Sequence, residues 1–264
     1  MRDEQYEIYA IRYGHHARRS HENFVGGDTH DGPMPLDYFV WVVRNGARTV
    51  VVDTGFNAAA AATRGRTLVR PVAEGLDALG IRADTVQDVV ITHLHYDHAG
   101  NLPLFAHARF HLQDQEMAFA TGRCMCHDLL SHGYSADDVS QMVRNVFDRR
   151  VQFHDGSATL APGLEIHHIG GHTRGLQVVR VATPRGWVVL ASDASHFYAH
   201  MEGDRAFPVL YNLGDMLEGY SRLRALAASP AHIIPGHDPL VLQRYPSASP
   251  ALTGWIARLD VAPL

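Results

Sequence analysis

A chain of 264 residues is long enough to form one large α/β domain with a substantial core. Its 46% apolar and 19% charged residues are typical of a globular protein, and a net charge of −5 argues against a nucleic-acid partner. No segment reaches the ~18 apolar residues of a membrane helix, and the first residues, MRDEQYEIYAIRY, lack the apolar core of a signal peptide. We therefore expect a single cytoplasmic domain over residues 1–264, without a membrane partner.

The first half of the chain predicts strands around one long loop. Apolar residues that alternate or cluster between turn signals predict strands, in chain order, over residues 6–13, 37–44, 48–55, 88–93 and 109–113. Asn45-Gly46 is a hairpin turn signal between the second and the third of these strands. A helix is expected over 69–80, ending at Gly80. The segment 14–36 contains Gly, His and Pro and is too long for a simple connection, which favours a functional loop.

The second half begins with helices and then returns to strands. Helices are expected over 114–121 and 136–147, and we interpret residues 114–147 as a helical insertion. The remaining elements follow in the order strand 164–169, strand 176–182, strand 187–192, helix 215–228 and strand 231–235. This order predicts an α/β fold in which two β-sheets pack face to face with helices on the outer faces, an αβ/βα sandwich.

The decisive motif follows the predicted strand 88–93. Residues 92–100 read THLHYDHAG, and a match to H-x-H-x-D-H is expected by chance in roughly one of a hundred chains of this composition. His93 and His95 alternate like strand residues, so that both can face one side, whereas Asp97 and His98 lie past the strand end and can face a second point. Imidazole and carboxylate groups suit zinc, and also iron, manganese or cobalt.

The stretch T-H-x-H-x-D-H followed by Ala-Gly resembles the signature of the metallo-β-lactamase superfamily. The superfamily pattern continues with a histidine after a glycine, an aspartate at the end of a strand and a last histidine near the C-terminus. This chain offers His172 after Gly171, Asp193 after the predicted strand 187–192, and His237 after Gly236. The resemblance covers about residues 37–240 and implies the metallo-β-lactamase fold, with two mixed β-sheets.

The resemblance also implies a centre of two divalent metal ions, for which zinc is favoured. The implied metal ligands are His93, His95 and His172 for one ion, Asp97, His98 and His237 for the other, and Asp193 as a bridge between them. A water or hydroxide would complete the bridge. Asp53, in the stretch VVVDTG, is expected either to accept the ring N–H of a ligand histidine or to be an ordinary turn residue before Gly55.

Two adjacent metal ions activate a water and polarise a carbonyl oxygen, which implies hydrolysis of an ester, thioester, lactone, amide or phosphoester. Asp193 argues against true metallo-β-lactamases, which lack this bridge. The acidic charge balance argues against RNA-processing members, and the pair His93 and His95 argues against flavodiiron proteins, which replace one of these histidines with glutamate. Persulfide dioxygenases and a glyoxalase II-like thioesterase stay open, although the C-terminal tail has few cations for glutathione. An inactive metal-binding interaction module is a further alternative.

The chain is most similar to the N-acyl homoserine lactonase group in its size and in the stretches Asp193-Ala194-Ser195 and Gly236-His237-Asp238. This similarity implies a quorum-quenching enzyme that acts on an ester bond, opening a small-molecule lactone by attack of the bridging hydroxide. Many lactonases have a tyrosine three residues after the bridging aspartate, where this chain has His196, with Tyr198 two positions further on. Either side chain could donate to the oxyanion. The candidate catalytic residues are Asp97, Asp193, His196 and Tyr198.

The substrate pocket is expected between the 14–36 loop, with Phe24 and Met34, and the 114–147 insertion. Apolar residues of the insertion would serve a structural core equally well. Cys124 and Cys126 are predicted to be ordinary thiols, because cysteines spaced two residues apart rarely form a good disulfide. The sequence leaves homodimerisation open.

Overall fold

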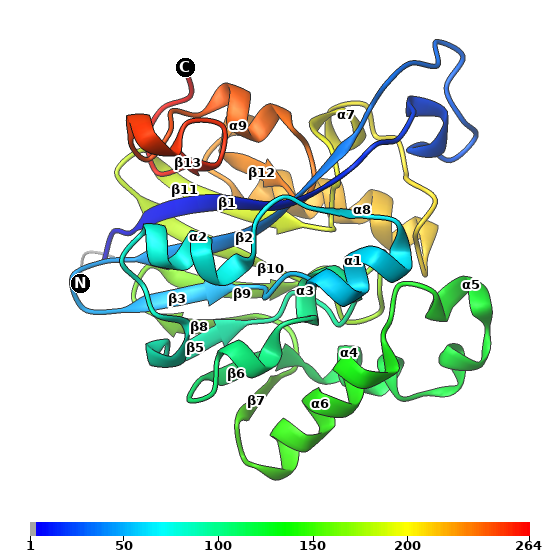
Figure 1. Ribbon diagram of the computed structural model, residues 1–264. Coiled ribbons are helices and arrows are strands. Elements are labelled where there is room, and N and C mark those ends of the chain that lie inside the picture. The colour runs from blue at the N-terminus through cyan, green and yellow to red at the C-terminus, as the bar shows by residue number, and fades with distance from the viewer. Residues whose placement is uncertain (1–3) are drawn as a thin grey trace.

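The computed structural model describes residues 4–264, so the first three residues of the N-terminal segment discussed above lie outside it. Two β-sheets pack against each other, with helices on the outer faces (Figure 1). The first sheet has the spatial order β13 (Ile256–Arg258), β1 (Glu7–His16), β2 (Leu36–Arg44), β3 (Thr49–Val52), β5 (Asp88–Val90), β6 (Arg109–Gln113) and β7 (Val151–His154), with β4 (Thr67–Leu68) paired to β1. The predicted αβ/βα sandwich is confirmed.

The second sheet consists of β12 (Ile233–Pro235), β11 (Gly186–Ser192), β10 (Gln177–Thr183), β9 (Leu164–His168) and β8 (Ala158–Ala161), in this order. Both sheets are mixed. In the first sheet β3, β5, β6 and β7 are parallel, and in the second sheet β11 and β12 are parallel. Parallel strands end at the same edge of a sheet, so the residues that follow β3 and β5, or β11 and β12, come close together.

The described helices are mostly short. They are α1 (Ala58–Arg64), α2 (Val72–Ala78), α3 (Tyr96–Ala99), α4 (Asp114–Ala120), α5 (Asp128–Ser131), α6 (Ala136–Phe147), α7 (Tyr198–Glu202), α8 (Leu213–Leu226) and α9 (Leu240–Arg244). The predicted helices 136–147 and 215–228 correspond to α6 and α8, and 114–121 corresponds to α4. None of the helices in residues 4–264 has the length and apolar character needed to cross a membrane.

Several predicted boundaries differ from the structure. The strand predicted over 48–55 ends at Val52, because Asp53 has a φ of 63° and turns the chain out of the sheet. The helix predicted over 69–80 begins only at Val72, because a residue before proline disfavours the helical conformation and the backbone N–H groups of Val69 and Arg70 bind the Tyr13 carbonyl oxygen beside β4. Strand β1 extends to His16, which shortens the long loop to residues 17–35.

Apolar side chains form two layers of core. One lies between the sheets and includes Trp41, Ile166 and Leu190, and the other lies between the first sheet and its outer helices and includes Val40 and Phe110. Strand β2 is buried on both faces, since successive residues contribute to opposite layers. Each fully buried side chain of this size stabilises the fold by about 1.5–3 kcal/mol relative to exposure, so the strands form a stable scaffold for the loops at their ends.

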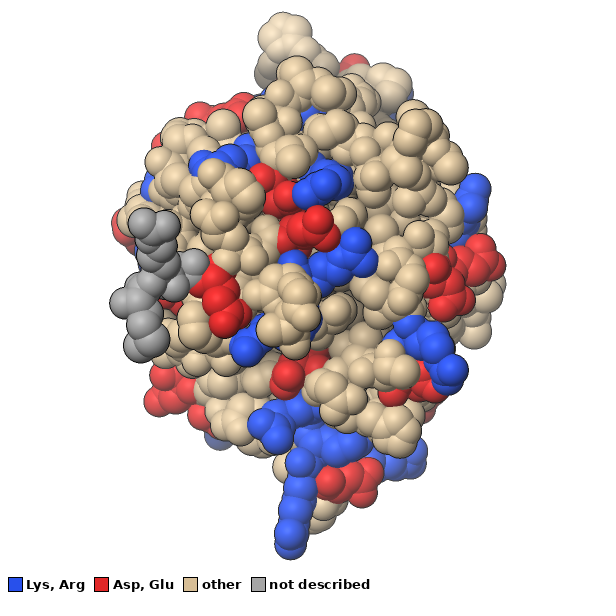
Figure 2. Space-filling view, turned by 90° about the vertical axis from the view of Figure 1, so that its left-hand side faces the viewer, with Lys and Arg blue, Asp and Glu red and all other residues tan. Residues whose placement is uncertain are grey.

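The side of the molecule that carries the β2–β3 turn is shown in Figure 2, where positive and negative residues are interleaved. Next to this turn, Arg44 Nε lies 3.0 Å from Glu7 Oε2. Arg258 Nη2 lies 2.5 Å from Asp260 Oδ2. Charges on this face therefore largely neutralise one another.

Candidate metal centre

All seven predicted ligands lie together where strands of both sheets end. His93, His95, Asp97 and His98 follow β5, His172 follows β9, Asp193 follows β11 and His237 follows β12. Each of the seven residues is at most 8% exposed. Burial of so many polar groups at one place is costly unless they bind one another or a cation.

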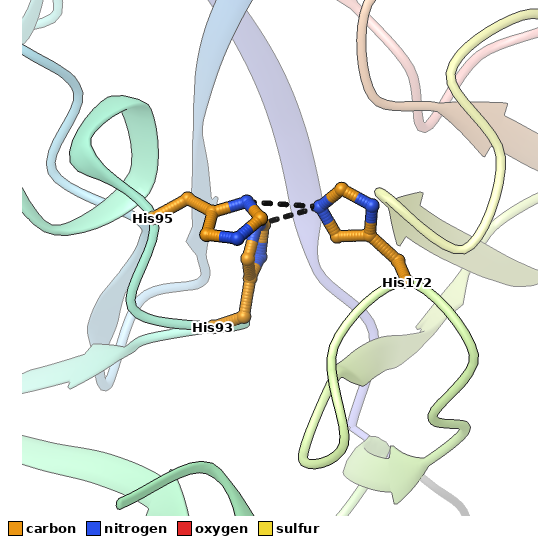
Figure 3. A group of neighbouring side chains, drawn as sticks. All are labelled: His93, His95 and His172. Atoms are coloured by element: carbon orange, nitrogen blue, oxygen red, sulfur yellow. Dashed lines mark hydrogen bonds between the residues drawn. The ribbon is translucent and has the colours of Figure 1, made fainter. Parts of the chain in front are cut away.

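The first cluster consists of His93, His95 and His172 (Figure 3). His172 Nε2 lies 3.2 Å from His93 Nε2 and 3.0 Å from His95 Nδ1. A tetrahedral zinc ion with bonds of 2.0–2.1 Å separates its ligand atoms by about 3.3 Å. Burial lowers the pKa of His93 and of His95 well below the usual value, and so keeps both rings in the neutral form that binds a metal.

The second cluster consists of Asp97, His98 and His237. Asp97 Oδ2 lies 3.7 Å from His98 Nε2 and 3.9 Å from His237 Nε2, too far for hydrogen bonds. His98 Nε2 is buried and has no hydrogen-bond partner within residues 4–264. An unpartnered buried nitrogen among further donors is the environment expected of a metal ligand.

Asp193 lies between the two clusters. Its Oδ2 is 3.2 Å from His172 Nε2, whereas its Oδ1 is 3.2 Å from His98 Nε2 and 3.0 Å from His237 Nε2. Oδ1 is buried, and among the described residues no group forms a hydrogen bond with it. Each carboxylate oxygen thus faces a different cluster, and the seven residues fit two cations that share Asp193.

The outward nitrogens of three of the candidate ligand histidines bind acceptors. His98 Nδ1 lies 2.7 Å from Asp53 Oδ2, His172 Nδ1 lies 2.6 Å from the Val209 carbonyl oxygen, and His237 Nδ1 lies 3.0 Å from the Asp37 carbonyl oxygen. These acceptors fix the tautomer in which the Nε2 lone pair faces the cluster. For Asp53 the first of the two alternatives therefore holds: it accepts the ring N–H of His98.

His196 adjoins the centre, whereas Tyr198 does not. His196 Nε2 lies 2.9 Å from Asp193 Oδ2, and the ring stacks on Phe207 at 3.7 Å. Burial lowers the pKa of His196 well below its usual value, so that the neutral ring donates to Asp193. Tyr198 packs in the core beneath Arg244, which lies 3.9 Å from the ring centre, and its buried hydroxyl has no partner within residues 4–264.

Aromatic rings connect the centre with the two segments expected to wall the pocket, directly from the insertion and through two further rings from the long loop. Phe24 of the long loop packs edge-on against His200 at 5.0 Å, and His200 stacks on Phe207, the ring that also contacts His196. From the insertion, the ring of Tyr134 lies 4.6 Å from that of His95. Met34 is half-buried. Cys124 and Cys126 are free thiols, and neither occurs in the clusters of potential metal ligands found in the described part of the chain.

Sequence reasoning missed a group of cations beside the second cluster. Arg66 Nε donates to the Tyr96 hydroxyl at 3.1 Å, and the Arg64 guanidinium lies 4.0 Å from the centre of the Tyr96 ring. The Tyr38 ring lies between this group and His237, 5.0 Å from the imidazole. Within residues 4–264 no carboxylate lies within 4.0 Å of either arginine. No local motif marks this pair, because the Tyr96 side chain that both arginines contact lies about 30 residues further along the chain.

Sequence reasoning also missed Glu116 of α4, which is fully buried and hydrogen-bonded to the loops of the first cluster. No local signal marks it, because its partners lie 18 to 59 residues away in the chain.

An αβ/βα sandwich with His and Asp clusters at its strand ends defines the class of metallo-hydrolase folds. The family model described as Metallo-beta-lactamase superfamily matches residues 34–237, and the chain therefore belongs to this superfamily of hydrolases. The family and the fold predicted from the motif are both confirmed.

Two sequence relatives carry functional names. A probable metallo-hydrolase of Mycobacterium tuberculosis is 27% identical over 213 residues, which cover 73% of this chain and 68% of that protein. The N-acyl homoserine lactonase AttM of Azorhizobium caulinodans is 30% identical over 172 residues, 61% of this chain and 62% of the relative.

Solved structures share the fold. A quorum-quenching N-acyl homoserine lactone lactonase superposes with a TM-score of 0.74 at 21% identity, covering 89% of this chain and 94% of the other. An N-acyl homoserine lactone hydrolase with the product N-hexanoyl-L-homoserine at its catalytic metal centre gives a TM-score of 0.73 at 21% identity, covering 90% and 94%. At this identity the likeness establishes the architecture.

Proposed function

We propose that this protein is a dinuclear metal-dependent hydrolase that opens the ring of N-acyl homoserine lactones. The observation that carries the proposal is the position of Asp193, whose two oxygens face two separate sets of buried ligands. A single-metal site would need only one of these sets. The names of the lactonase relatives in sequence and in structure support the substrate class.

Under this proposal His93, His95 and His172 hold one divalent ion, and Asp97, His98 and His237 hold the other. Zinc is the favoured metal for such a donor set, since neutral imidazole and carboxylate suit it. When bound, two such ions would polarise the scissile carbonyl and lower the pKa of a shared water. The protein's part is to hold the ligand atoms at fixed separations, and this accounts for the carbonyl and carboxylate acceptors on the outward nitrogens of His98, His172 and His237.

His196 is the proposed donor to the oxyanion. Its neutral ring donates the Nε2 hydrogen to Asp193 Oδ2 at 2.9 Å, at the boundary of the two clusters, and would redirect this hydrogen to the oxyanion when the substrate binds. A prepositioned N–H beside the reacting carbonyl stabilises the negative charge that develops on oxygen in the transition state. Asp193 or a water would return a proton to the leaving alkoxide. The 17–35 loop and the 114–147 insertion would exclude bulk water from this point.

A glyoxalase II-like thioesterase is the second candidate. The observation that favours it is the pair Arg64 and Arg66 beside Tyr96, because guanidinium groups without a carboxylate partner would attract an anionic substrate such as a glutathione thioester. An inactive interaction module is less well supported, since proteins that have lost the activity usually also lose a ligand, and this chain retains all seven candidate ligands.

The test is a hydrolysis panel with the metal-loaded protein. N-acyl homoserine lactones of several chain lengths, glutathione thioesters and phosphodiesters are compared by kcat/KM. The proposal expects the lactones to be the best substrates. A thioester as the best substrate would replace the lactonase proposal by the thioesterase, and a protein that is equally active after complete metal removal would refute both.

A further inference from the structure

Glu116 of α4 is a fully buried acid that accepts four hydrogen bonds. Its Oε1 accepts from the backbone N–H of Leu94 at 2.9 Å and from the Tyr134 hydroxyl at 2.9 Å. Its Oε2 accepts from the Thr173 hydroxyl at 2.6 Å and from the backbone N–H of Gly175 at 3.1 Å. Both oxygens are therefore satisfied, each by one backbone N–H and one hydroxyl, as a buried carboxylate requires.

The four donors come from the three segments that surround the first cluster. Leu94 is the residue between His93 and His95. Thr173 directly follows His172, and Gly175 lies two residues further along the same loop. The ring of Tyr134 packs edge-on against that of His95 at 4.6 Å. One carboxylate thus connects the neighbours of all three ligands in the first cluster.

The second cluster has other supports. His98 binds Asp53, and His237 binds the Asp37 carbonyl oxygen. Asp37 belongs to β2 and Asp53 to the turn after β3, whereas α4 follows β6. Glu116 therefore binds neighbours of the first cluster alone, whereas Asp53 binds His98 directly and also Thr92 beside His93.

The packing around Glu116 leaves little room for adjustment. A Cβ atom added to Gly175 would lie 2.1 Å from the backbone nitrogen of Glu116, so α4 and the His172 loop are in direct backbone contact. A Cβ added to Gly133, next to Tyr134, would lie 2.6 Å from His95 Nε2. These contacts fix the distance between the segments, while the carboxylate fixes their orientation.

We propose that Glu116 is the positioning residue of the first metal site: it fixes the orientation of the His93–His95 segment relative to the His172 loop, and so determines the affinity of the first ion without affecting the second. The inference rests on the proposed two-metal centre and extends it. A carboxylate that orients metal ligands contributes a factor of about 10–100 to metal affinity. Glu116 would do so for three ligands at once, through their neighbours.

Two variants, each of which retains only one of the two proposed metal sites, allow the zinc affinity of each site to be measured separately. His237→Ala removes a ligand of the second cluster and leaves the first site, whereas His172→Ala leaves the second. Zinc is titrated into each metal-free protein against a competing chelator, with and without Glu116→Gln. A carboxamide can accept from only one side, so Glu116→Gln should weaken zinc binding about 10–100-fold in the His237→Ala background. It should change zinc binding less than twofold in the His172→Ala background.

Asp260→Asn is the matched control. Asp260 is also a buried acid, only 2% exposed, and accepts a hydrogen bond from the Ile8 backbone N–H at 3.1 Å, but its partners lie away from both clusters. Its substitution should leave both zinc affinities unchanged. If Glu116→Gln does not fold, Tyr134→Phe and Thr173→Val each remove one donor, and each should give a smaller loss confined to the first site.

An equal loss of zinc affinity in both backgrounds, or no loss in either, would overturn the role of Glu116. The same result would leave the proposed hydrolase intact, provided that the unsubstituted chain binds two ions. If the unsubstituted chain binds no zinc, it is the two-metal proposal that fails. The experiment therefore distinguishes the two failures.

Discussion

Asp53 and His98 lie 45 residues apart in the chain, and the Asp53 carboxylate accepts a hydrogen bond from the His98 ring at 2.7 Å. The same carboxylate accepts from the Thr92 backbone N–H and hydroxyl at 2.7 and 2.8 Å. Asp53 therefore orients one ligand directly and also fixes the start of the segment that carries His93.

Asp53→Ala should reduce zinc affinity and kcat/KM by about 10–100-fold, because His98 would lose the acceptor that fixes its tautomer. Metal content after dialysis and kcat/KM at saturating zinc measure the two effects separately. Asp53→Ala protein with unchanged zinc affinity would contradict the orienting role of the carboxylate.

Asp193→Ala should abolish tight binding of both ions and the activity with them, since each oxygen of the carboxylate faces a different cluster. Metal analysis of the unsubstituted protein should give about two ions per chain. The variant should hold fewer than one. A variant with one ion still bound tightly would show that Asp193 serves a single site.

His196→Ala should lower kcat by roughly 10²–10³ with a smaller change in KM, the cost of losing one donor to the transition-state oxyanion. Tyr198→Phe is the comparison, because the Tyr198 hydroxyl is buried in the core without a partner within residues 4–264. This substitution should leave kcat unchanged and raise the free energy of unfolding slightly, since an unsatisfied buried hydroxyl costs about 1–3 kcal/mol. The opposite pattern of kcat effects would exchange the roles of the two residues.

Acidification should destabilise the protein through His200. Burial lowers the pKa of His200 to about 4, and its Nδ1 already accepts a hydrogen bond from the Phe197 backbone N–H. The unfolded state, with an ordinary histidine pKa near 6.5, then binds a proton before the folded state does. The contribution of neutral His200 to the free energy of unfolding is therefore complete above about pH 6.5. It decreases by up to about 3 kcal/mol as the pH drops toward 4.

The measurement for His200 is the free energy of unfolding of metal-free protein between pH 4 and 7. His200→Gln keeps a donor for the Asn23 carbonyl oxygen, which His200 Nε2 contacts at 2.9 Å, but it cannot titrate. In this variant the free energy of unfolding should fall less steeply with decreasing pH, by the slope that corresponds to uptake of one proton on unfolding. An identical slope in both proteins would assign the acid sensitivity to other groups.

The sequence predicts the strands of the sandwich well, because a short apolar run between turn signals indicates a strand buried on both faces, as in β2 and β11. It predicts the seven ligands because their order and their positions after strands follow from the family motif. It misses α1, where seven residues that are mainly alanine give no apolar period, although Asn57 caps its first turn and Gly65 ends it at a φ of 63°.

Other features of the centre depend on contacts between distant segments. Nothing near Glu116 in the chain indicates that its carboxylate faces Leu94 and Thr173. The choice between His196 and Tyr198 likewise depends on how the chain turns after β11. His196 faces Asp193, whereas α7 directs Tyr198 beneath Arg244 in α9. Tertiary packing decides both cases, and a single sequence does not encode it locally.

Each cluster takes its ligands from both sheets of the sandwich. The first sheet supplies His93, His95, Asp97 and His98 through β5, and the second supplies His172, Asp193 and His237. A bound ion would therefore act as a cross-link between the two sheets, formed only once they have packed together. Above saturation, each tenfold rise in free zinc should then add about 1.4 kcal/mol per ion to the free energy of unfolding. The zinc concentration of the environment would therefore determine how stable the packing of the two sheets is.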